Sequence, residues 1–227
     1  MTVFLDMSRI DSKALADCGL SHNPFTALVV PRPIGWISTL STDGIANLAP
    51  FSFFNAVSQN PPMVMFCANA THADGGPKDS LRNVRASGEF VANLATWPLR
   101  WHMNVSSASA PRGQDEFELA GLTKASSIKV RAPRVAESPV SLECVVVKIV
   151  ELPQADGSSL PNTVTFGRVV GVHIDPDLIT NGRVDIRRAR PIGRLGYLDY
   201  AELAEFFQMP RPDWPVQDSA RGDHDDA

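Results

Sequence analysis

Apolar and β-branched residues between positions 27 and 70 come in short runs that polar turn residues separate. Val, Ile, Phe, Trp and Thr dominate these runs, and we predict strands over residues 34–40, 46–57 and 63–68. Asp43-Gly44 lies between the first two strands and predicts a hairpin turn, because this dipeptide tolerates the positive φ that such turns need. The first third of the chain is therefore predicted to consist of antiparallel strands.

The rest of the chain combines short helical patterns with two long strands. Helices are predicted where apolar residues recur every three or four positions, and strands where β-branched residues follow one another. In chain order these elements are a helix over 77–88, a strand over 89–96, helices over 97–108 and 115–122, and strands over 141–152 and 163–174. Regular strand–helix–strand units are missing, so we predict a mainly β fold, an antiparallel barrel with inserted helices.

The two ends of the chain differ from its middle in composition. Residues 1–24 mix charged and small residues, and we predict an N-terminal arm with a short helix. Residues 25–207 contain the strand and helix patterns and are predicted to be the domain. Residues 208–227 are polar, acidic and rich in proline, which predicts a mobile tail.

Composition and charge exclude several classes of protein. The 227 residues include 18 Pro and 15 Gly, and 20 % are charged, which favours many turns and excludes a coiled coil. The chain has 21 Lys and Arg against 25 Asp and Glu, a net charge of −4. Because proteins that coat nucleic acid need a basic surface, we predict no nucleic-acid partner.

The sequence contains no candidate membrane span and no signal peptide. Its longest apolar runs are far shorter than the roughly 20 residues that cross a bilayer. The three cysteines, Cys18, Cys67 and Cys144, are far apart, so neither a disulfide framework nor a zinc site is indicated. We predict a soluble, cytoplasmic protein with reduced thiols and no membrane partner.

Motifs of the common catalytic chemistries are absent. The chain has no GxGxxG or GxxxxGK[ST] loop for phosphates, no HExxH helix and no GxSxG elbow. Its five histidines lack the spacing of metal ligands, so no metal site is predicted. The residues taken by themselves name no reaction and no catalytic side chain.

Several segments, taken together and in order, carry a resemblance to a known family. They are RPIGWISTL at 32–40, NLAPFSFF at 47–54, NPPMV at 60–64, KDSLRN at 78–83, GRVVGVH at 167–173 and PIGRLGYLDY at 191–200. Over roughly residues 25–205 the chain resembles the flavin reductase-like family, the FMN-binding split barrels. Its length resembles the longer, flavoredoxin-like branch.

The resemblance implies a fold, a cofactor and a reaction class. The implied fold is a six-stranded antiparallel split barrel that forms a homodimer, with FMN at or near the subunit interface; FAD is an alternative cofactor. The favoured function is an oxidoreductase in which NAD(P)H reduces the flavin and electrons pass to a small-molecule or protein acceptor. The alternative is a flavin-binding electron carrier without NAD(P)H activity of its own. In both cases the cofactor performs the redox step, which agrees with the absence of catalytic motifs.

The resemblance also implies which residues contact the flavin. They are Trp36, Ser38, Thr39, Asn47, Ala49, Pro50, Ser52, Phe53, Lys78, Asp79 and Ser80. Pro50 interrupts a strand ladder and so frees neighbouring backbone groups for a ligand. Residues 78–80 lie where a helix begins, and a helix N-terminus suits a phosphate.

Each of these assignments has a structural alternative. Aromatic residues on strands, such as Trp36 and Phe53, more often belong to the core. A lysine such as Lys78 is more often a solvated surface residue, and Asp79 is equally suited to capping the helix. Asn47 follows a turn and could satisfy turn backbone.

The closing segments supply two further candidates and one departure from the family pattern. His173 either lines the substrate side of the flavin or is a structural histidine at a strand end. Arg194 either pairs with a carboxylate or reaches the phosphate of a flavin or nicotinamide. The family's closing pair of glycines is Gly196-Tyr197 in this chain, so Tyr197 either stacks on the ring or blocks part of the pocket.

Overall fold

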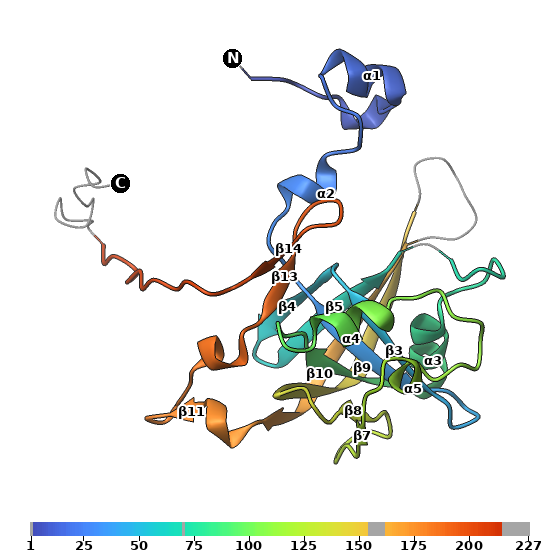
Figure 1. Cartoon of the computed structure of the whole chain (residues 1–227), viewed down its shortest axis with the longest axis vertical. Helices are drawn as coiled ribbons and strands as arrows, with labels where there is room; N and C mark the ends of the chain where they lie inside the picture. Colours follow the sequence, from blue (N-terminus) through green and yellow to red (C-terminus); the bar gives the residue numbers. More distant parts are fainter. Residues whose placement is uncertain (1, 70, 154–161, 215–227) are drawn as a thin grey trace.

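The computed structural model describes residues 2–69, 71–153 and 162–214, and it has a β-rich body with an arm at each end (Figure 1). The largest sheet has seven strands, and every neighbouring pair in it is antiparallel. In spatial order these strands are β3 (Ala46–Phe51), β2 (Gly35–Leu40), β6 (Glu89–Leu94), β9 (Val140–Leu152), β10 (Asn162–Ile174), β5 (Pro62–Ala68) and β4 (Phe54–Gln59). The predicted mainly β, antiparallel architecture is confirmed.

The strand predicted over 46–57 is in fact two strands, which is why the sheet has seven strands rather than six. Ser52 and Phe53 separate β3 from β4, and these two strands stand at opposite ends of the sheet order. Two residues can connect the two edges only if the sheet curls round to bring them together. The backbone N–H of Cys67 on β5 donates to the carbonyl of Phe53 at 2.8 Å, so the break is tied to the neighbouring strand. We call this break at residues 52–53 the barrel split.

The core lies inside the curled sheet and beneath its helices. Trp36, Phe66, Phe90 and Phe117 are fully buried. The rings of Phe66 and Phe90 meet edge to face with centroids 5.2 Å apart, an arrangement that aromatic pairs prefer. Alternation along the strands therefore places these large side chains in the interior, as their residue type favours.

Three short helices cover β2 and β3 (Figure 1). They are α3 (Asp79–Ser87), α4 (Arg100–Val105) and α5 (Glu116–Leu119). Helix α3 ends at Gly88, whose φ of 72° is readily adopted by glycine and stops the helix there. The predicted helices over 97–108 and 115–122 are shorter in the structure, because their flanking residues form turns.

The closing segment of the domain forms a second, three-stranded sheet. Its order is β1 (Arg32–Pro33), β13 (Ile192–Arg194) and β14 (Tyr200–Glu202), again antiparallel. The remaining elements are η1 (Met7–Arg9), α1 (Ser12–Asp17), α2 (Phe25–Leu28), β7 (Lys124–Ala125), β8 (Arg134–Val135), η2 (Pro176–Leu178), β11 (Ile179–Thr180), β12 (Arg183–Val184) and η3 (Ile186–Ala189). The second sheet ties the end of the domain to its first strand.

The two ends of the described chain extend from the body (Figure 1). The N-terminal arm contains the predicted short helix, α1. Residues 203–213 have no helix or strand and are largely exposed. Most of the predicted tail, residues 215–227, lies outside the described residues. None of the helices in the described ranges has the length and apolar character that a membrane span requires.

Candidate functional site

Five of the residues predicted to contact a ligand surround one small pocket at the start of α3. Asn47, Ala49, Lys78, Asp79 and Ser80 line a cavity of about 80 Å³, together with Thr71, His72, residues 106–110 and Glu116. We call this cavity the α3 pocket. Residues from β3, α3 and the loop after α4 thus meet in space although they are far apart in the sequence.

The first turn of α3 offers unpaired donors to this pocket. Lys78 is the N-cap residue and makes no side-chain capping bond, so the prediction that Asp79 caps the helix is wrong: Asp79 is the first helical residue and its carboxylate accepts from Arg112 instead. The first backbone bond of the helix runs from the N–H of Arg82 to the carbonyl of Lys78 at 3.0 Å. The preceding N–H groups have no partner within the helix, and the helix dipole adds partial positive charge there. This geometry suits an anionic group such as a phosphate.

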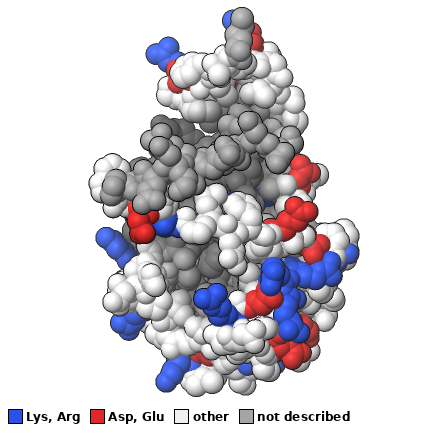
Figure 2. Space-filling model, turned by 90° about the vertical axis from the view of Figure 1, so that its left-hand side faces the viewer, with Lys and Arg blue, Asp and Glu red and all other residues white. Residues whose placement is uncertain are grey.

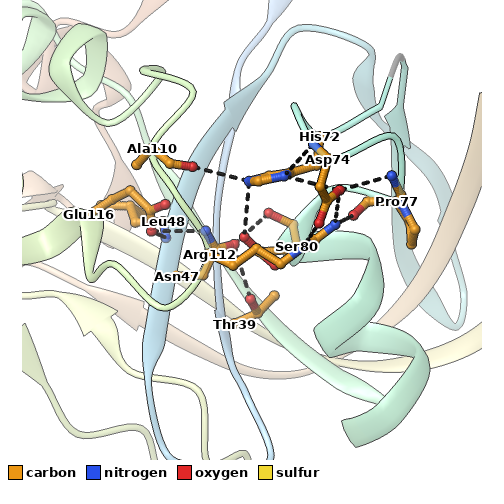
Figure 3. A network of polar contacts seen from close by, with 12 residues as sticks. Thr39, Asn47, Leu48, His72, Asp74, Pro77, Ser80, Ala110, Arg112 and Glu116 are labelled. Carbon is orange, nitrogen blue, oxygen red and sulfur yellow. Dashed lines mark hydrogen bonds and ion pairs between the residues drawn. The ribbon is translucent and has the colours of Figure 1, made fainter.

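Asn47 is the centre of a buried polar network beside these donors (Figure 3). Its Oδ1 accepts from the hydroxyl of Ser80 at 2.7 Å and from that of Thr39 at 3.4 Å. Its Nδ2 donates to Oε2 of Glu116 at 2.8 Å. The hydroxyl of Thr39 in turn accepts from Nδ2 of Asn83 at 3.0 Å. The network fixes the orientation of the Asn47 amide and joins β2, β3, α3 and α5.

Glu116 is a buried acid at the end of this network. Its Oε2 also accepts from the backbone N–H of Leu48 at 3.0 Å. Burial raises the pKa of Glu116 above its ordinary value, although the hydrogen bonds from Leu48 and Asn47 act in the opposite direction. Glu116 therefore holds Asn47 in place, although burial disfavours the charged form of its carboxylate.

Arg112 joins the loop before α3 to the helix itself (Figure 3). Its guanidinium donates to Oδ1 of Asp79 at 2.5 Å, to Oδ1 of Asp74 at 2.8 Å and to the carbonyl of Pro77 at 3.0 Å. The hydrogen bond with Arg112 holds the pKa of Asp74 well below its usual range. Arg112 thus neutralises Asp79, which would otherwise repel an anion at the helix start.

A second, larger pocket lies at the barrel split and contains the other predicted contacts. Pro50, Ser52 and Phe53 line this cavity of about 330 Å³, which we call the split pocket. Residues from the closing segment, among them Arg194 and Tyr197, line it as well. Ser107 lines both the split pocket and the α3 pocket, so the two cavities adjoin.

Three residues expected to contact a ligand have their side chains inside the protein instead. Trp36 and Ser38 are fully buried: the indole N–H of Trp36 donates to the hydroxyl of Ser106 at 2.9 Å, and the hydroxyl of Ser38 donates to the carbonyl of Pro133 at 2.5 Å. Thr39 is also fully buried, within the Asn47 network. Both faces of β2 are covered, so successive side chains are buried although they point in opposite directions. Trp36 and Thr39 support the α3 pocket from behind, because they contact its lining residues Ser106 and Asn47.

The two substrate-side candidates are not brought together. His173 on β10 lines a different cavity, beside Arg134 and Asp175, that shares no lining residue with the α3 or split pocket. Its Nε2 makes a hydrogen bond with Oε1 of the fully buried Glu143. This placement favours the structural role for His173. Arg194, by contrast, lines the split pocket.

Sequence reasoning missed Arg112, Glu116 and His72. Arg112 lies in a polar Pro-Arg-Gly turn, which marks a loop but not its position in space. Glu116 directly follows a helix cap and reads as an ordinary first-turn acid. His72 contacts the carbonyl of Ala110 at 3.1 Å and Asp74 at 3.2 Å, contacts that only the folded loop creates.

Charged side chains on the face shown in Figure 2 are mixed in sign. Lys and Arg lie beside Asp and Glu across the described part of that face, with uncharged surface between them. No group of three or more His, Cys, Asp or Glu among the described residues is arranged to hold a metal ion. The candidate site thus consists of the α3 pocket and the adjoining split pocket.

Comparison with known proteins identifies the family. The model of the flavin reductase like domain matches residues 27–193. An uncharacterized protein of Aquifex aeolicus is 41 % identical over 170 residues, covering 74 % of this chain and 83 % of that protein. The structure of nitrilotriacetate monooxygenase component B from Bacillus cereus matches with a TM-score of 0.82 and 29 % identity, over 92 % of this chain and 98 % of that one. The 2-nitrobenzoate 2-nitroreductase NbaA of Pseudomonas fluorescens matches with a TM-score of 0.75 and 25 % identity, over 93 % and 98 %. The chain belongs to the flavin reductase-like family and has its split-barrel fold.

Proposed function

We propose that this protein binds FMN and is an oxidoreductase that reduces the bound flavin with NAD(P)H and passes the electrons to an acceptor. The observation that carries this proposal is the adjacency of two unlike cavities at Ser107. One is small and polar at a helix start, and the other is larger and is lined by the barrel split. An elongated ligand with an anionic end and a planar end matches both. The family and the redox names of the two structural neighbours support the same class of reaction.

The α3 pocket is where the phosphate of FMN would bind. The ammonium group of Lys78 and the open N–H groups of the first helical turn supply charge and donors. Arg112 removes the repulsion from Asp79 by pairing with it. Asn47, held by Glu116, keeps the Ser80 hydroxyl in a fixed orientation.

The barrel split is where the flat ring of FMN would bind. Pro50 lies within β3 opposite Trp36, so it does not break the ladder as predicted, but it has no N–H to donate. Because β3 is an edge strand of the sheet, backbone groups near the split are not all used by strand pairing. Phe53 and Ile34 add apolar surface to the split pocket. Bound FMN supplies the two-electron chemistry, accepting hydride from NAD(P)H and giving electrons to a small-molecule or protein acceptor. The chain itself provides binding, orientation and charge.

The proposal includes a homodimer with the flavin at or near the interface. Large apolar side chains remain exposed on both the arms and the body of the single chain. Phe207 and Trp214 of the C-terminal arm are 82 % and 89 % exposed, and Val147 and Val172 of the long hairpin are 56 % and 55 % exposed. Exposed apolar surface of this kind is typical of an interface. A second copy of the chain is the proposed partner.

Anaerobic titration of the purified, FMN-loaded protein tests the function. We expect FMN to remain with the protein through gel filtration and its absorbance to bleach within seconds of adding NADH or NADPH. Protein that never takes up FMN contradicts the proposal outright. Protein that holds FMN but is reduced by neither nucleotide, while dithionite reduces it, points to the alternative, a flavin-binding electron carrier.

A further inference from the structure

The split pocket has an unbalanced positive charge. Arg32 and Arg194 are the charged residues among those that line it, and no Asp or Glu does so. Neither guanidinium lies within ion-pair distance of a carboxylate among the described residues. Two like charges side by side without a neutralising carboxylate favour a bound anion.

Arg32 is held rigidly in this position. The residue is 8 % exposed, and its Nη atoms donate to the backbone carbonyls of Thr26, Val29 (2.8 Å) and Leu195 (2.8 Å). Its Nε is buried and finds no hydrogen-bond partner in the part of the chain that the structure describes. Burial, and then the charge of Arg194, lower the pKa of Arg32 from its ordinary value. Carbonyl oxygens satisfy some of its donors but do not neutralise its charge.

Aromatic rings stand beside the second guanidinium. The Arg194 guanidinium carbon lies 4.4 Å from the centroid of the Tyr200 ring, and its Nη2 donates to the carbonyl of Tyr197. Tyr197 has a φ of 53°, a left-handed conformation that is uncommon for residues other than glycine. Its ring is nevertheless placed at the pocket, and it meets the ring of His22 edge to face at 5.8 Å. Backbone strain of this kind persists only where the surrounding structure imposes it and is concentrated at functional sites.

We propose that the split pocket binds the anionic group of a small aromatic electron acceptor, a ring that carries a carboxylate or a phosphate. Arg194 pairs with the anion, Arg32 adds positive charge from behind, and Tyr197 and Tyr200 flank the ring. Within the split pocket, the proposal places the flavin ring against the barrel-split residues Pro50, Ser52 and Phe53, and the acceptor against Arg194, Tyr197 and Tyr200 of the closing segment. This assignment rests on the proposed function, because it places the acceptor next to the flavin.

Calorimetric titration with three probes tests the chemistry. Benzoate and phenyl phosphate carry the two anionic groups, and benzamide is a neutral molecule of nearly the same shape as benzoate. We expect at least one anion to bind the FMN-loaded protein about tenfold or more tightly than benzamide, since a charge-assisted bond is lost in the neutral probe. The anion that binds more tightly shows whether the pocket prefers a carboxylate or a phosphate. Equal affinity for benzamide and both anions overturns the proposal.

The Arg194→Gln variant tests the residue. We expect the preferred anion to bind about tenfold more weakly, while the FMN content measured by flavin absorbance is unchanged. Anion affinity that does not change, or FMN content that falls together with it, overturns the assignment, because the second result would give the guanidinium to the flavin. Titrating FMN-free protein in parallel separates this proposal from the proposed function. Protein that takes up no FMN but prefers anions through Arg194 contradicts the function alone.

Tyr197→Gly tests the aromatic wall, with Asn181→Gly as its matched control. Both residues adopt left-handed backbone, with φ of 53° and 51°, so glycine relieves strain at either position. Asn181 lies in the turn between β11 and β12, and none of the described pockets includes it. We expect Tyr197→Gly to weaken anion binding severalfold and Asn181→Gly to leave it unchanged, with no loss of thermal stability in either. Weakened binding in both variants, or in neither, counts against the role of Tyr197.

Discussion

Lys78 is the residue on which the proposed phosphate site depends most directly. It lies immediately before α3 and lines the same pocket as the open end of the helix. The nearby guanidinium of Arg112 is already paired with Asp74 and Asp79 and cannot replace the charge of Lys78. The position therefore combines a mobile cation with fixed backbone donors, which together recognise a doubly charged group.

Lys78→Ala is expected to weaken FMN binding by roughly 1.5–3 kcal/mol, the contribution of one charge-assisted contact. Riboflavin has no phosphate, so its affinity should not change. Titration of flavin fluorescence with both ligands measures the difference. Lys148→Ala, at an exposed position on β9, is the control and should bind both ligands normally. An equal loss for FMN and riboflavin in Lys78→Ala would place the phosphate elsewhere.

Glu116 gives the site a pH dependence whose sign can be worked out. Because burial raises its pKa in the folded state, the folded protein binds this proton more strongly than the unfolded chain does. The contribution of Glu116 to stability is therefore greatest at acidic pH, below its unfolded pKa, and falls as pH rises through its folded pKa.

Glu116→Gln keeps an oxygen acceptor for Asn47 and Leu48 but removes the charge. We expect its free energy of unfolding, relative to that of the native protein, to increase between pH 4 and pH 7. Urea denaturation at several pH values measures the change. A difference between the two proteins that is constant with pH would show that Glu116 does not titrate in this range.

One buried carboxylate on the long hairpin of β9 and β10, that of Glu143, holds the loop over residues 126–132 in place. Glu143 is fully buried and accepts from the backbone N–H groups of Ile128 (2.8 Å), Lys129 (2.5 Å) and Val130 (3.1 Å). Burial alone would raise the pKa of Glu143, but the hydrogen bonds from His173 and these N–H groups together lower it. At the scale of elements, His173 thus serves to fix a loop to the hairpin.

His173→Ala is expected to lower the free energy of unfolding by about 1–3 kcal/mol, because it leaves part of a buried carboxylate unsatisfied. FMN affinity and the KM for NAD(P)H should stay unchanged. Arg168→Ala, at an exposed position on the same strand, is the control and should change stability by less than about 0.5 kcal/mol. A raised KM at unchanged stability would instead assign His173 to the substrate.

The closed sheet and the arms differ in how much apolar surface they leave exposed. The curled sheet buries its own core, whereas the arms expose large apolar side chains such as Phe207 and Trp214. Burying these side chains requires a further surface, which the proposed second copy of the chain would supply by symmetry.

Light scattering coupled to gel filtration should give twice the mass of the 24.6 kDa chain. If the flavin lies at or near the interface, diluting the protein should weaken FMN binding as the dimer dissociates. A monomer that binds FMN with undiminished affinity would contradict both the dimer and the interfacial position of the flavin.

Much of the fold could be predicted because its signals are local. The β-branched runs of β9 and β10, the Asp43-Gly44 turn and the glycine after α3 each act within a few residues. The break at Ser52 and Phe53 could not be predicted in this way. Pro50 precedes the break but lies within β3 and does not end it, and only closure of the sheet requires the chain to change edges there.

Local sequence patterns predicted most of the strands, the region in which α3 begins and the family motifs, because periodicity, turn chemistry and motif order are properties of neighbouring residues. Tertiary structure decided which candidates meet. It turned Trp36 and Ser38 inward, placed His173 on Glu143, and brought Arg112 to α3 and Arg32 to Arg194. These outcomes depend on how the sheet curls and which strand faces point inward, and contacts between distant segments arise only after that closure.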